Sequence, residues 1–514
     1  MKKRLCCLLL VLLVSTCTLS GCWEEPLPEE EDLPFQTEDE EPQDNREILP
    51  EQFALPYDPN ATLDPITCAD GMQQTVGTLL YQRLFQLDEN LEPQPELCQS
   101  YTCSADALTY TFTIRSGVTF WDGTALTAAD VASSLQRARS SQRYGSRLSR
   151  ITSISAGDAN TVTVTLAYAS TGLPALLDIP IVKSGTESEL IPVGSGPYCF
   201  HQDEDGPSLQ PNPYWQGSTL PVQEIILSPA GDRDAMLYQF TSHDVQLIVC
   251  DLTGTEPVTS VGNVSYQDAD TTILQYLGFN TQRSPFDNAA LRRALGLGIN
   301  RSALISAFFS GHALAAQFPV SPVSSLYPQE LETIYSYDAF ASAMAAAGYA
   351  TGTTTKTVTL LVNQENTFKV SAAQDLAEAL SAFDLKIQVS VLPWEEYTAA
   401  LAAGNFDLYF GEIKLTADWN LSSLLSSGGA LNYGGWADPQ TDTLLSQYAV
   451  SQDRAGAMKT LCTYLNTQAP ILPICFKRTS VLYQAGVIEG LQPTAANPFY
   501  NLSDCTIHLA EKAN

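Results

Sequence analysis

The sequence is poor in positive charge and in metal ligands. Its 514 residues include 26 Lys and Arg against 57 Asp and Glu, which gives a formal net charge of −31. Because nucleic-acid phosphates attract basic surfaces, this charge argues against a nucleic-acid partner. The four histidines (His201, His243, His312 and His508) are scattered and no C-x-x-C occurs, so we predict no metal site.

Enzyme motifs are missing as well. Neither the G-x-S-x-G nucleophile elbow nor the H-E-x-x-H zinc helix occurs. Ser310 and His312 lie almost side by side, an unusual placement for a nucleophile and its base. "VGSGPY" at 193–198 lacks the spacing and the lysine of a phosphate-binding loop, so it predicts a tight turn into a strand. We therefore predict no enzyme activity, no catalytic residue and no cofactor.

The apolar run "LCCLLLVLLV" at 5–14 is too short to span a membrane, which takes roughly 20 residues. It follows Lys2, Lys3 and Arg4, as in an export signal. "LSGC" at 19–22 resembles the lipobox of bacterial lipoproteins, which implies cleavage before Cys22 and lipidation of its sulfur. We predict a signal peptide at 1–21 and an extracytoplasmic protein anchored to the outer face of the cytoplasmic membrane. The alternative is an ordinary signal peptide with an incidental cysteine.

Residues 22–51 are acidic and proline-rich, with few apolar side chains. Such a segment cannot bury enough surface to fold, and its like charges extend it, so we predict a disordered tether. A binding tail for a basic partner is the alternative. From about residue 52, strand-like and helix-like patterns alternate, and 44% of the chain is hydrophobic, enough for two or three cores. The predicted fold class is α/β.

Eight of the twelve cysteines lie beyond the signal region. Cys98 and Cys103 could form a disulfide in an oxidising exterior, and the alternative is that both are free. Cys250 and Cys475 lie in apolar, strand-like runs, which predicts buried free thiols.

Residues 109–138 predict a hairpin followed by a capped helix. "TYTFTI" alternates with a period of two, and "RSG" turns it into a second strand that ends at "WDG". Thr127 and Asp130 form a capping pair at the start of the helix, and Val131 and Leu135 supply its buried face.

A second helix pattern lies in "SPFDNAALRRALGLGINRSAL" at 284–304. Leu291, Leu295 and Ile299 share one face, which predicts a core helix. Arg292 and Arg293 are predicted to point outward and to contact neighbouring acids, and docking on a membrane permease is the alternative.

"YTFTIRSGVTFWDGTALTAADV" resembles the signature of the family 5 extracellular solute-binding proteins, the peptide-binding and nickel-binding components of ABC importers. Further similar segments follow in the order of the family: "TLDP" at 62–65, "LLYQRLFQLDENLEPQPELCQSY" at 79–101, "GSGPY" at 194–198, "LGFNTQRSPFDNAALRRALGLGINRSALI" at 277–305, "FDLYFGEI" at 406–413 and "APILPICF" at 469–476. The resemblance therefore covers nearly the whole mature chain.

This resemblance implies a two-lobed periplasmic-binding-protein-like fold of type II, in the large cluster C form. Lobe one would comprise residues 52–270 and 475–514, and lobe two residues 271–474. The chain would cross between them near "TTILQYLGFN" and "APILPICF". Two crossings restrict the lobes to a hinge motion, so a ligand between them can be enclosed.

"VLPWEEYTAALAAGNFDLYFGEI" at 391–413 predicts a helix at 395–403, a stop at Gly404 and a strand at 406–413. Ligands of α/β sheets bind outside the carboxyl ends of the strands. "KLTADWN" at 414–420 is therefore expected beside the ligand. Glu412 is a further candidate, although the alternation of the strand could turn its side chain away.

In the oligopeptide-binding branch of the family, an aspartate after this strand pairs with the α-ammonium of the peptide, and a tryptophan of the preceding helix lines a pocket. By resemblance, Asp418, Trp419 and Asn420 match the first element and Trp394 the second. We expect the Asp418 carboxylate to lie dry and without a cation until the ligand supplies one. Its replacement by alanine should then weaken binding of free-amine peptides more than it lowers the melting temperature.

The sequence departs from the family at two points here, and other roles for these residues stay open. Leu421 and Ser422 replace the Glu-Pro that often follows in the family, and the loop before Asp418 is about two residues longer. Asp418 could instead cap a helix that begins near Leu421. Trp394 and Trp419 could be half-buried packing residues.

We predict the monomeric substrate-binding lipoprotein of an ABC importer. It would capture short peptides by lobe closure and deliver them to a permease with its ATPases, with main-chain hydrogen bonds giving general affinity. The alternatives are a nickel or metal-chelate binding protein of the same family, a peptide-sensing receptor lipoprotein, and an extracytoplasmic hydrolase on a lipid anchor.

Overall fold

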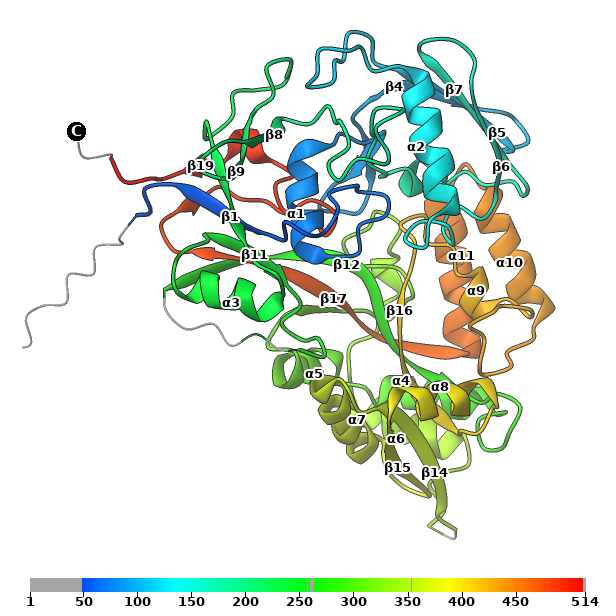
Figure 1. The fold of residues 1–514 in the computed structure, drawn as a ribbon. Helices are drawn as coiled ribbons and strands as arrows, with labels where there is room; N and C mark the ends of the chain where they lie inside the picture. Colours follow the sequence, from blue (N-terminus) through cyan, green and yellow to red (C-terminus); the bar gives the residue numbers. More distant parts are fainter. Residues whose placement is uncertain (1–48, 257, 259–262, 353, 512–514) are drawn as a thin grey trace, which may run out of the picture. The chain divides into compact units, whose positions relative to one another are not determined.

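Two long antiparallel strands, β12 (Val264–Phe279) and β17 (Ile471–Gln484), run side by side through the protein (Figure 1). The computed structural model describes residues 49–256, 258, 263–352 and 354–511. The predicted signal peptide, Cys22 and all but the last three residues of the tether therefore lie outside the described residues. Both strands are rich in β-branched and aromatic residues, which favour extended structure. They contain most of the two segments at which the chain was predicted to cross between lobes.

β12 and β17 belong to a seven-stranded sheet with the order β11-β17-β12-β16-β14-β15, and β13 adds to β17. The other strands are β11 (Leu247–Cys250), β13 (Ala313–Ala315), β14 (Lys356–Asn363), β15 (Leu385–Leu392) and β16 (Leu408–Lys414). β14 runs parallel to β15 and to β16, so the carboxyl ends of these three strands meet at one edge of the sheet.

The helices in the middle of the chain, residues 289–468, lie around this sheet (Figure 1). They are α4 (Ala289–Leu297), α5 (Arg301–Phe308), α6 (Tyr337–Ala346), α7 (Thr367–Leu380), α8 (Trp394–Ala402), α9 (Ser422–Leu425), α10 (Pro439–Val450) and α11 (Arg454–Gln468), with a 3₁₀ turn η2 (Gln329–Leu331). α7 packs on β14 and β15, and α10 packs on α11. The predicted sequence of helix, Gly404 stop and strand is confirmed, because α8 and β16 flank Gly404 in the left-handed region (φ +66°).

The N-terminal part forms four smaller sheets with three helices and a 3₁₀ turn, joined by the last residues of the chain. One sheet has the order β1-β10-β9-β8 and another β4-β5-β7-β6; β2 pairs with β3, and β18 with β19. These strands are β1 (Phe53–Tyr57), β2 (Phe85–Leu87), β3 (Pro93–Pro95), β4 (Cys98–Cys103), β5 (Thr109–Ile114), β6 (Ile151–Ala156), β7 (Thr161–Leu166), β8 (Tyr198–Gln202), β9 (Pro207–Pro211), β10 (Ile225–Pro229), β18 (Ile488–Glu489) and β19 (Thr506–Ile507). The helices are α1 (Gly71–Leu80), α2 (Ala128–Ser140) and α3 (Arg233–Thr241), with 3₁₀ turns η1 (Leu173–Leu176) and η3 (Leu502–Asp504).

The buried apolar side chains fall into groups that separate at β12 and β17. One core group comes only from residues 277–475, and another only from residues 66–181. A third joins residues 53–247 with residues 481–505. A fourth comes from residues 274–476 and takes in Leu91. This grouping is the one expected of the two predicted lobes, although the contacts join residues 47–514 into one unit. The lobe boundaries stay a prediction.

The capped helix at 128–140 is confirmed. The carboxylate of Asp130 accepts hydrogen bonds from the backbone N–H and the hydroxyl of Thr127, at 2.9 and 2.8 Å. Val131 and Leu135 are fully buried, as predicted. The second strand of the predicted hairpin is wrong, because the segment after "RSG" forms only an isolated bridge at Thr119. β5 already pairs with β4 on one edge and β7 on the other, so no edge is left for it.

The outward orientation predicted for Arg292 is also wrong. Its side chain is buried and donates to the backbone carbonyls of Phe286, Gln468 and Ala469, at 2.6 to 2.9 Å. α4 packs against α11, and the last carbonyls of a helix have no partner within the helix. The guanidinium satisfies these carbonyls, whereas Arg293 is exposed.

The eight cysteines beyond the predicted signal peptide and Cys22 are free thiols. Cys98 and Cys103 begin and end the same strand, β4, so extended backbone holds them about 16 Å apart. A disulfide needs Cα atoms within about 7 Å, so this pair cannot bridge. Cys475 is fully buried, as predicted, and Cys250 is partly buried.

Candidate functional site

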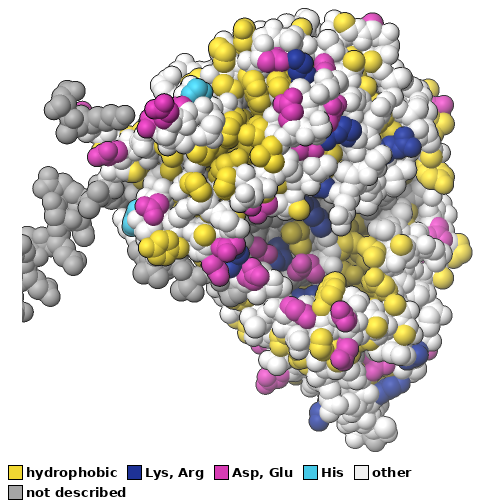
Figure 2. All heavy atoms as spheres, in the orientation of Figure 1, with side chains coloured by type: hydrophobic (Ala, Val, Ile, Leu, Met, Phe, Trp, Pro, Cys, Tyr) yellow, Lys and Arg dark blue, Asp and Glu magenta, His cyan; other side chains and the backbone are white. Residues whose placement is uncertain are grey.

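The carboxyl ends of β14 and β16 bring together charged and polar side chains. Lys369 of α7 is buried, and its ammonium donates to the side-chain oxygen of Asn363 at 2.9 Å. Glu412 is exposed on β16 and accepts a hydrogen bond from Gln275 at 2.8 Å. Burial lowers the pKa of Lys369 to about 8, and the negative charge of Glu412 opposes this shift. Figure 2 shows a hollow in the protein surface over β12 and β16, with acidic and basic side chains along it.

Trp394 opens α8 just after β15, and 55% of its surface is exposed. Its ring stacks on Tyr397 with centroids 5.9 Å apart, and its backbone N–H donates to the carboxylate of Glu365 at 2.7 Å. An exposed tryptophan held in one orientation by a neighbouring ring provides an apolar surface for a ligand side chain. Trp394 and Glu412 are therefore both accessible, as ligand-binding residues must be.

Asp418 lies in a different environment from the one predicted. Its side chain is 3% exposed, and its carboxylate lies 3.4 Å from the guanidinium of Arg150. The same carboxylate accepts the hydroxyl of Thr416 at 2.5 Å and the backbone N–H of Asn420 at 3.3 Å. The acid is dry, as expected, but the expectation that it lacks a cation is wrong, because Arg150 supplies one.

The alternative helix-cap role is not seen either. α9 begins at Ser422, and its N-terminus receives no side-chain capping bond from Asp418. Asn420 instead accepts the backbone N–H of Ser422 at 3.0 Å. Trp419 is 1% exposed and packs edge-on against Phe476 at 5.7 Å, so it belongs to the core. Its left-handed backbone (φ +52°) is uncommon for a bulky residue.

Asp418 and Arg150 lie on different predicted lobes, and further bonds join the same surfaces. The carbonyl of Asp418 accepts from Arg454 at 2.6 Å. Arg454 also donates to the hydroxyl of Thr171 at 3.2 Å, and the backbone N–H of Thr171 donates to Ala449 at 2.9 Å. Gly172 lies so close that an added Cβ would be 2.7 Å from Asp418. The residues around Asp418 thus form a contact between the predicted lobes.

The sequence analysis missed a group of basic residues beside this contact. Five of the 26 Lys and Arg lie within 137–150: Arg137, Arg139, Arg143, Arg147 and Arg150. At the average frequency of the chain, a segment of this length would hold fewer than one. The clustering was visible in the sequence and is the signal that could have found these residues.

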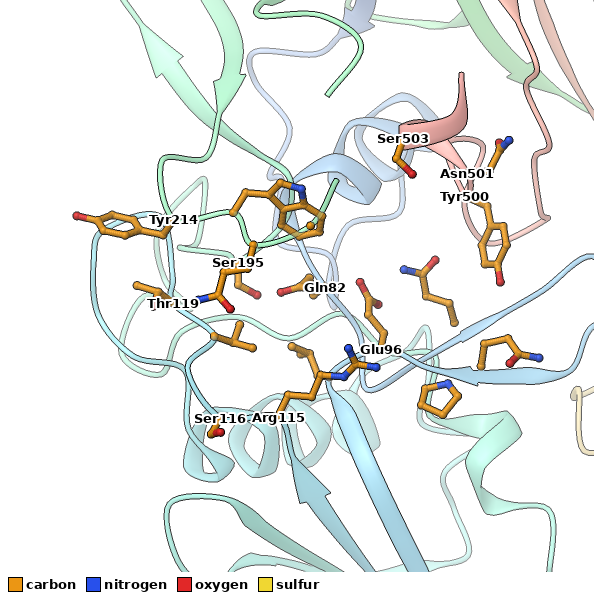
Figure 3. Close-up of a pocket in the computed structure, with 18 of the residues that line it drawn as sticks. Gln82, Glu96, Arg115, Ser116, Thr119, Ser195, Tyr214, Tyr500, Asn501 and Ser503 are labelled. Carbon is orange, nitrogen blue, oxygen red and sulfur yellow. The ribbon is translucent and has the colours of Figure 1, made fainter. Parts of the chain in front are cut away.

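A pocket of about 540 Å³ lies elsewhere, and its lining residues come only from 82–119, 195–217 and 500–504. Arg115 and Glu96 extend toward each other inside it, with Tyr214 on one side and Tyr500 on the other (Figure 3). None of the predicted site residues contributes to its lining. A cavity within predicted lobe one cannot close on a ligand by hinge motion, so we place the candidate site at β14 to β16.

The sheet order, the parallel edge and the two long strands define a mixed α/β periplasmic-binding-protein-like fold. The crystal structure titled as a nickel ABC transporter from Bacillus halodurans is similar, with a TM-score of 0.74 and 20% identity over 88% of this chain and 98% of that one. The oligopeptide-binding protein AppA from Bacillus subtilis, solved with a nonapeptide, has a TM-score of 0.59 and 19% identity over 90% of this chain and 100% of that one.

The family profile "Bacterial extracellular solute-binding proteins, family 5 Middle" matches residues 92–432. The chain belongs to this family and is the extracytoplasmic substrate-binding protein of an ABC importer. It is a binding protein rather than an enzyme. The glutathione-binding protein GsiB of Escherichia coli (strain K12) is 28% identical over 428 residues, which cover 77% of this chain and 82% of that protein. None of the helices in the described residues is long and apolar enough to cross a membrane.

Proposed function

We propose that the protein captures short peptides or peptide-like solutes between the predicted lobes and delivers them to a permease with its ATPases. The exposed face of β16 carries this proposal. Glu412 and Lys414 are two residues apart and both exposed, so their side chains leave the same face of the strand. Two residues of strand span about 7 Å, which is comparable to the separation of the ammonium and carboxylate of a short peptide.

The charges on this face are complementary to a zwitterion. Glu412 would receive the ammonium end, and Lys414 the carboxylate end. Trp394 would contact a side chain of the ligand, and the exposed Glu365 beside it adds negative charge near the ammonium. Asp418, paired with Arg150, is assigned to the contact between the lobes, together with Trp419 and Asn420. The name of the relative GsiB supports a peptide-like class of ligand, since glutathione is a modified tripeptide.

We also propose that a lipid on Cys22 anchors the protein and that the acidic tether at 22–51 holds it away from the membrane. The apolar run at 5–14 and the "LSGC" sequence support this proposal. Mass spectrometry of the protein from a native host should find a diacylated N-terminal Cys22. A Cys22→Ser variant should be released into the medium or periplasm.

Native mass spectrometry of the purified protein tests the ligand class. We expect co-purified peptides or peptide-like molecules in the mass range of two to five residues. Glu412→Gln should weaken binding of free-amine peptides at least tenfold and leave binding of N-acetylated peptides unchanged. Glu378→Gln is the matched control, because Glu378 is an exposed acid on α7. Stoichiometric nickel without any peptide, or no binding of any peptide by the wild type, would refute the proposal.

A further inference from the structure

The pocket in predicted lobe one lies apart from the proposed ligand site. Its volume of about 540 Å³ falls within the range of about 300–1,000 Å³ that small-molecule sites occupy. Its lining residues come only from 82–119, 195–217 and 500–504, so none of them belongs to β14, β15 or β16. A molecule bound there would not occupy the side chains proposed to bind the transported solute.

Three aromatic side chains line this pocket: Tyr214, Trp215 and Tyr500. Tyr214 and Tyr500 lie on opposite sides of it (Figure 3). The indole N–H of Trp215 donates to the carbonyl of Ser218 at 3.3 Å, and a Cβ added at Gly217 would lie 2.3 Å from the indole ring. Glycine at 217 therefore leaves the space that the ring occupies. The rings offer flat apolar surfaces to a ligand.

The loop that carries the first two of these rings is tied to its surroundings. Asn212 accepts the backbone N–H of Tyr214 at 3.0 Å and donates to the carbonyl of Gly196 at 2.9 Å. The side-chain amide of Gln216 donates to the carbonyl of Gly117 at 2.7 Å. This wall of the pocket is therefore preformed, as the walls of small-molecule sites usually are.

Polar side chains of the pocket have unused hydrogen-bonding capacity. Arg115 is exposed, and among the described residues its guanidinium has no hydrogen-bond or ion-pair partner. The hydroxyl of Ser195 is buried and likewise has no partner within the part of the chain that the structure describes. Five side-chain amides, each with donor and acceptor atoms, also line the pocket: Gln82, Gln86, Gln94, Gln216 and Asn501.

The charged side chains of the lining nearly balance. They are one base, Arg115, and two acids, Glu96 and Asp504. Arg115 and Glu96 extend toward each other across the pocket (Figure 3). The pocket therefore has no strong preference for an ion of either sign, and a neutral ligand with many hydrogen-bonding groups fits it best.

A saccharide has this chemistry. The C–H groups of a sugar ring form an apolar face that packs on an aromatic ring, and its hydroxyl groups both donate and accept hydrogen bonds. A planar amide, carboxylate or guanidinium can bond two neighbouring hydroxyls at once. We propose that this pocket binds a neutral saccharide of monosaccharide or disaccharide size, at a site separate from that of the transported solute. The inference does not depend on the proposed function.

Isothermal titration calorimetry on the chain without its predicted signal peptide tests the proposal. The ligands are the disaccharides maltose, cellobiose and N,N′-diacetylchitobiose, with adenosine as a compound whose base also stacks on aromatic rings. We expect at least one disaccharide to bind with a Kd of about 1 mM or lower and at least tenfold more tightly than adenosine.

Two pairs of variants locate the bound disaccharide. Trp215→Ala should weaken its binding at least tenfold, and Trp215→Phe should restore most of the affinity. Trp394→Ala is the matched control, because Trp394 is the exposed tryptophan of the proposed ligand site, and it should leave disaccharide binding unchanged. Arg115→Met should weaken disaccharide binding at least fivefold without lowering the melting temperature, since Arg115 has no partner among the described residues. Arg293→Met, at an exposed arginine outside the pocket, is its control.

The saccharide could be a free sugar or a unit of a longer glycan, and the tetrasaccharide of the same series as the best disaccharide distinguishes the two sources. A tetrasaccharide that binds as tightly as the disaccharide supports a site for glycan chains. One that binds at least tenfold more weakly supports a site for free sugars.

Three results would overturn the inference. The first is that no disaccharide binds the wild type. The second is that adenosine binds more tightly than every disaccharide, which would refute the saccharide class. The third is that Trp394→Ala abolishes disaccharide binding while Trp215→Ala and Arg115→Met do not, which would place the sugar in the proposed ligand site. The first two results leave the proposed capture of peptides untouched, because peptide binding is measured separately.

Discussion

Replacing Asp418 by alanine should destabilise the protein more than it weakens ligand binding. The carboxylate is 3% exposed and joins Arg150, the Thr416 hydroxyl and the Asn420 N–H. Removing one partner of a buried ion pair costs about 3–5 kcal/mol, because the other charge remains buried without compensation. Arg150 keeps a hydrogen bond to Ser170 at 2.9 Å, and 17% of its side chain is exposed. We therefore expect Asp418→Ala to lower the free energy of unfolding by about 3 kcal/mol, near the lower end of this range.

Urea unfolding followed by tryptophan fluorescence measures this loss, and Trp419 places a reporter next to the substitution. A double-mutant cycle with Arg150→Met isolates the pair: the double variant should be about as stable as Asp418→Ala alone, with a coupling energy of about 1–3 kcal/mol. Unchanged stability with a large loss of affinity for free-amine peptides would refute this reasoning. It would restore the ammonium-binding role that the sequence resemblance implies for Asp418.

Three further predictions concern buried groups. The pKa of Lys369 is about 8 in the folded protein and about 10.4 in the unfolded chain, so the unfolded chain binds more protons between these values. Lys369 therefore contributes stability that grows from pH 8 to pH 10, so the free energy of unfolding of the wild type, minus that of Lys369→Met, should increase over this range in urea unfolding. In Gly194→Ala the new Cβ would lie 2.2 Å from the carbonyl oxygen of Leu80, so melting should show a loss of at least about 1–3 kcal/mol. Arg292→Met removes three hydrogen bonds to backbone carbonyls, two of them buried, and should lower the free energy of unfolding in urea by about 3 kcal/mol or more. Arg293→Met should be within about 0.5 kcal/mol of the wild type.

Local sequence patterns predicted the elements that frame the site. α8, the left-handed Gly404 and β16 follow from a helical period, a glycine stop and an apolar strand, all within about 20 residues. The capping pair at Thr127 and Asp130 is equally local. Such features depend on side chains that are neighbours in the chain, so tertiary packing does not change them.

The wrong predictions for Arg292 and for the second hairpin strand have a common cause. Both assume that the pattern of neighbouring residues alone decides whether a side chain is exposed or a segment forms a strand. Arg292 looks like a surface residue of an amphipathic helix, but carbonyls at the end of α11 require a donor at that point. The segment after β5 reads as a hairpin strand, but β4 and β7 already occupy both edges. Only the position of distant elements decides such cases.

Asp418 illustrates the same limit at the functional level. The motif around it indicates a buried acid that needs a cation, and the structure agrees that the acid is buried. A motif cannot tell whether the cation comes from the ligand or from the chain, because the partner depends on where Arg150 lies in the fold. When the chain supplies the cation, the acid contributes to lobe contact and no longer selects the ligand. Selectivity then passes to accessible side chains of β16, with Glu412 as the acid that we propose for the ammonium of the ligand.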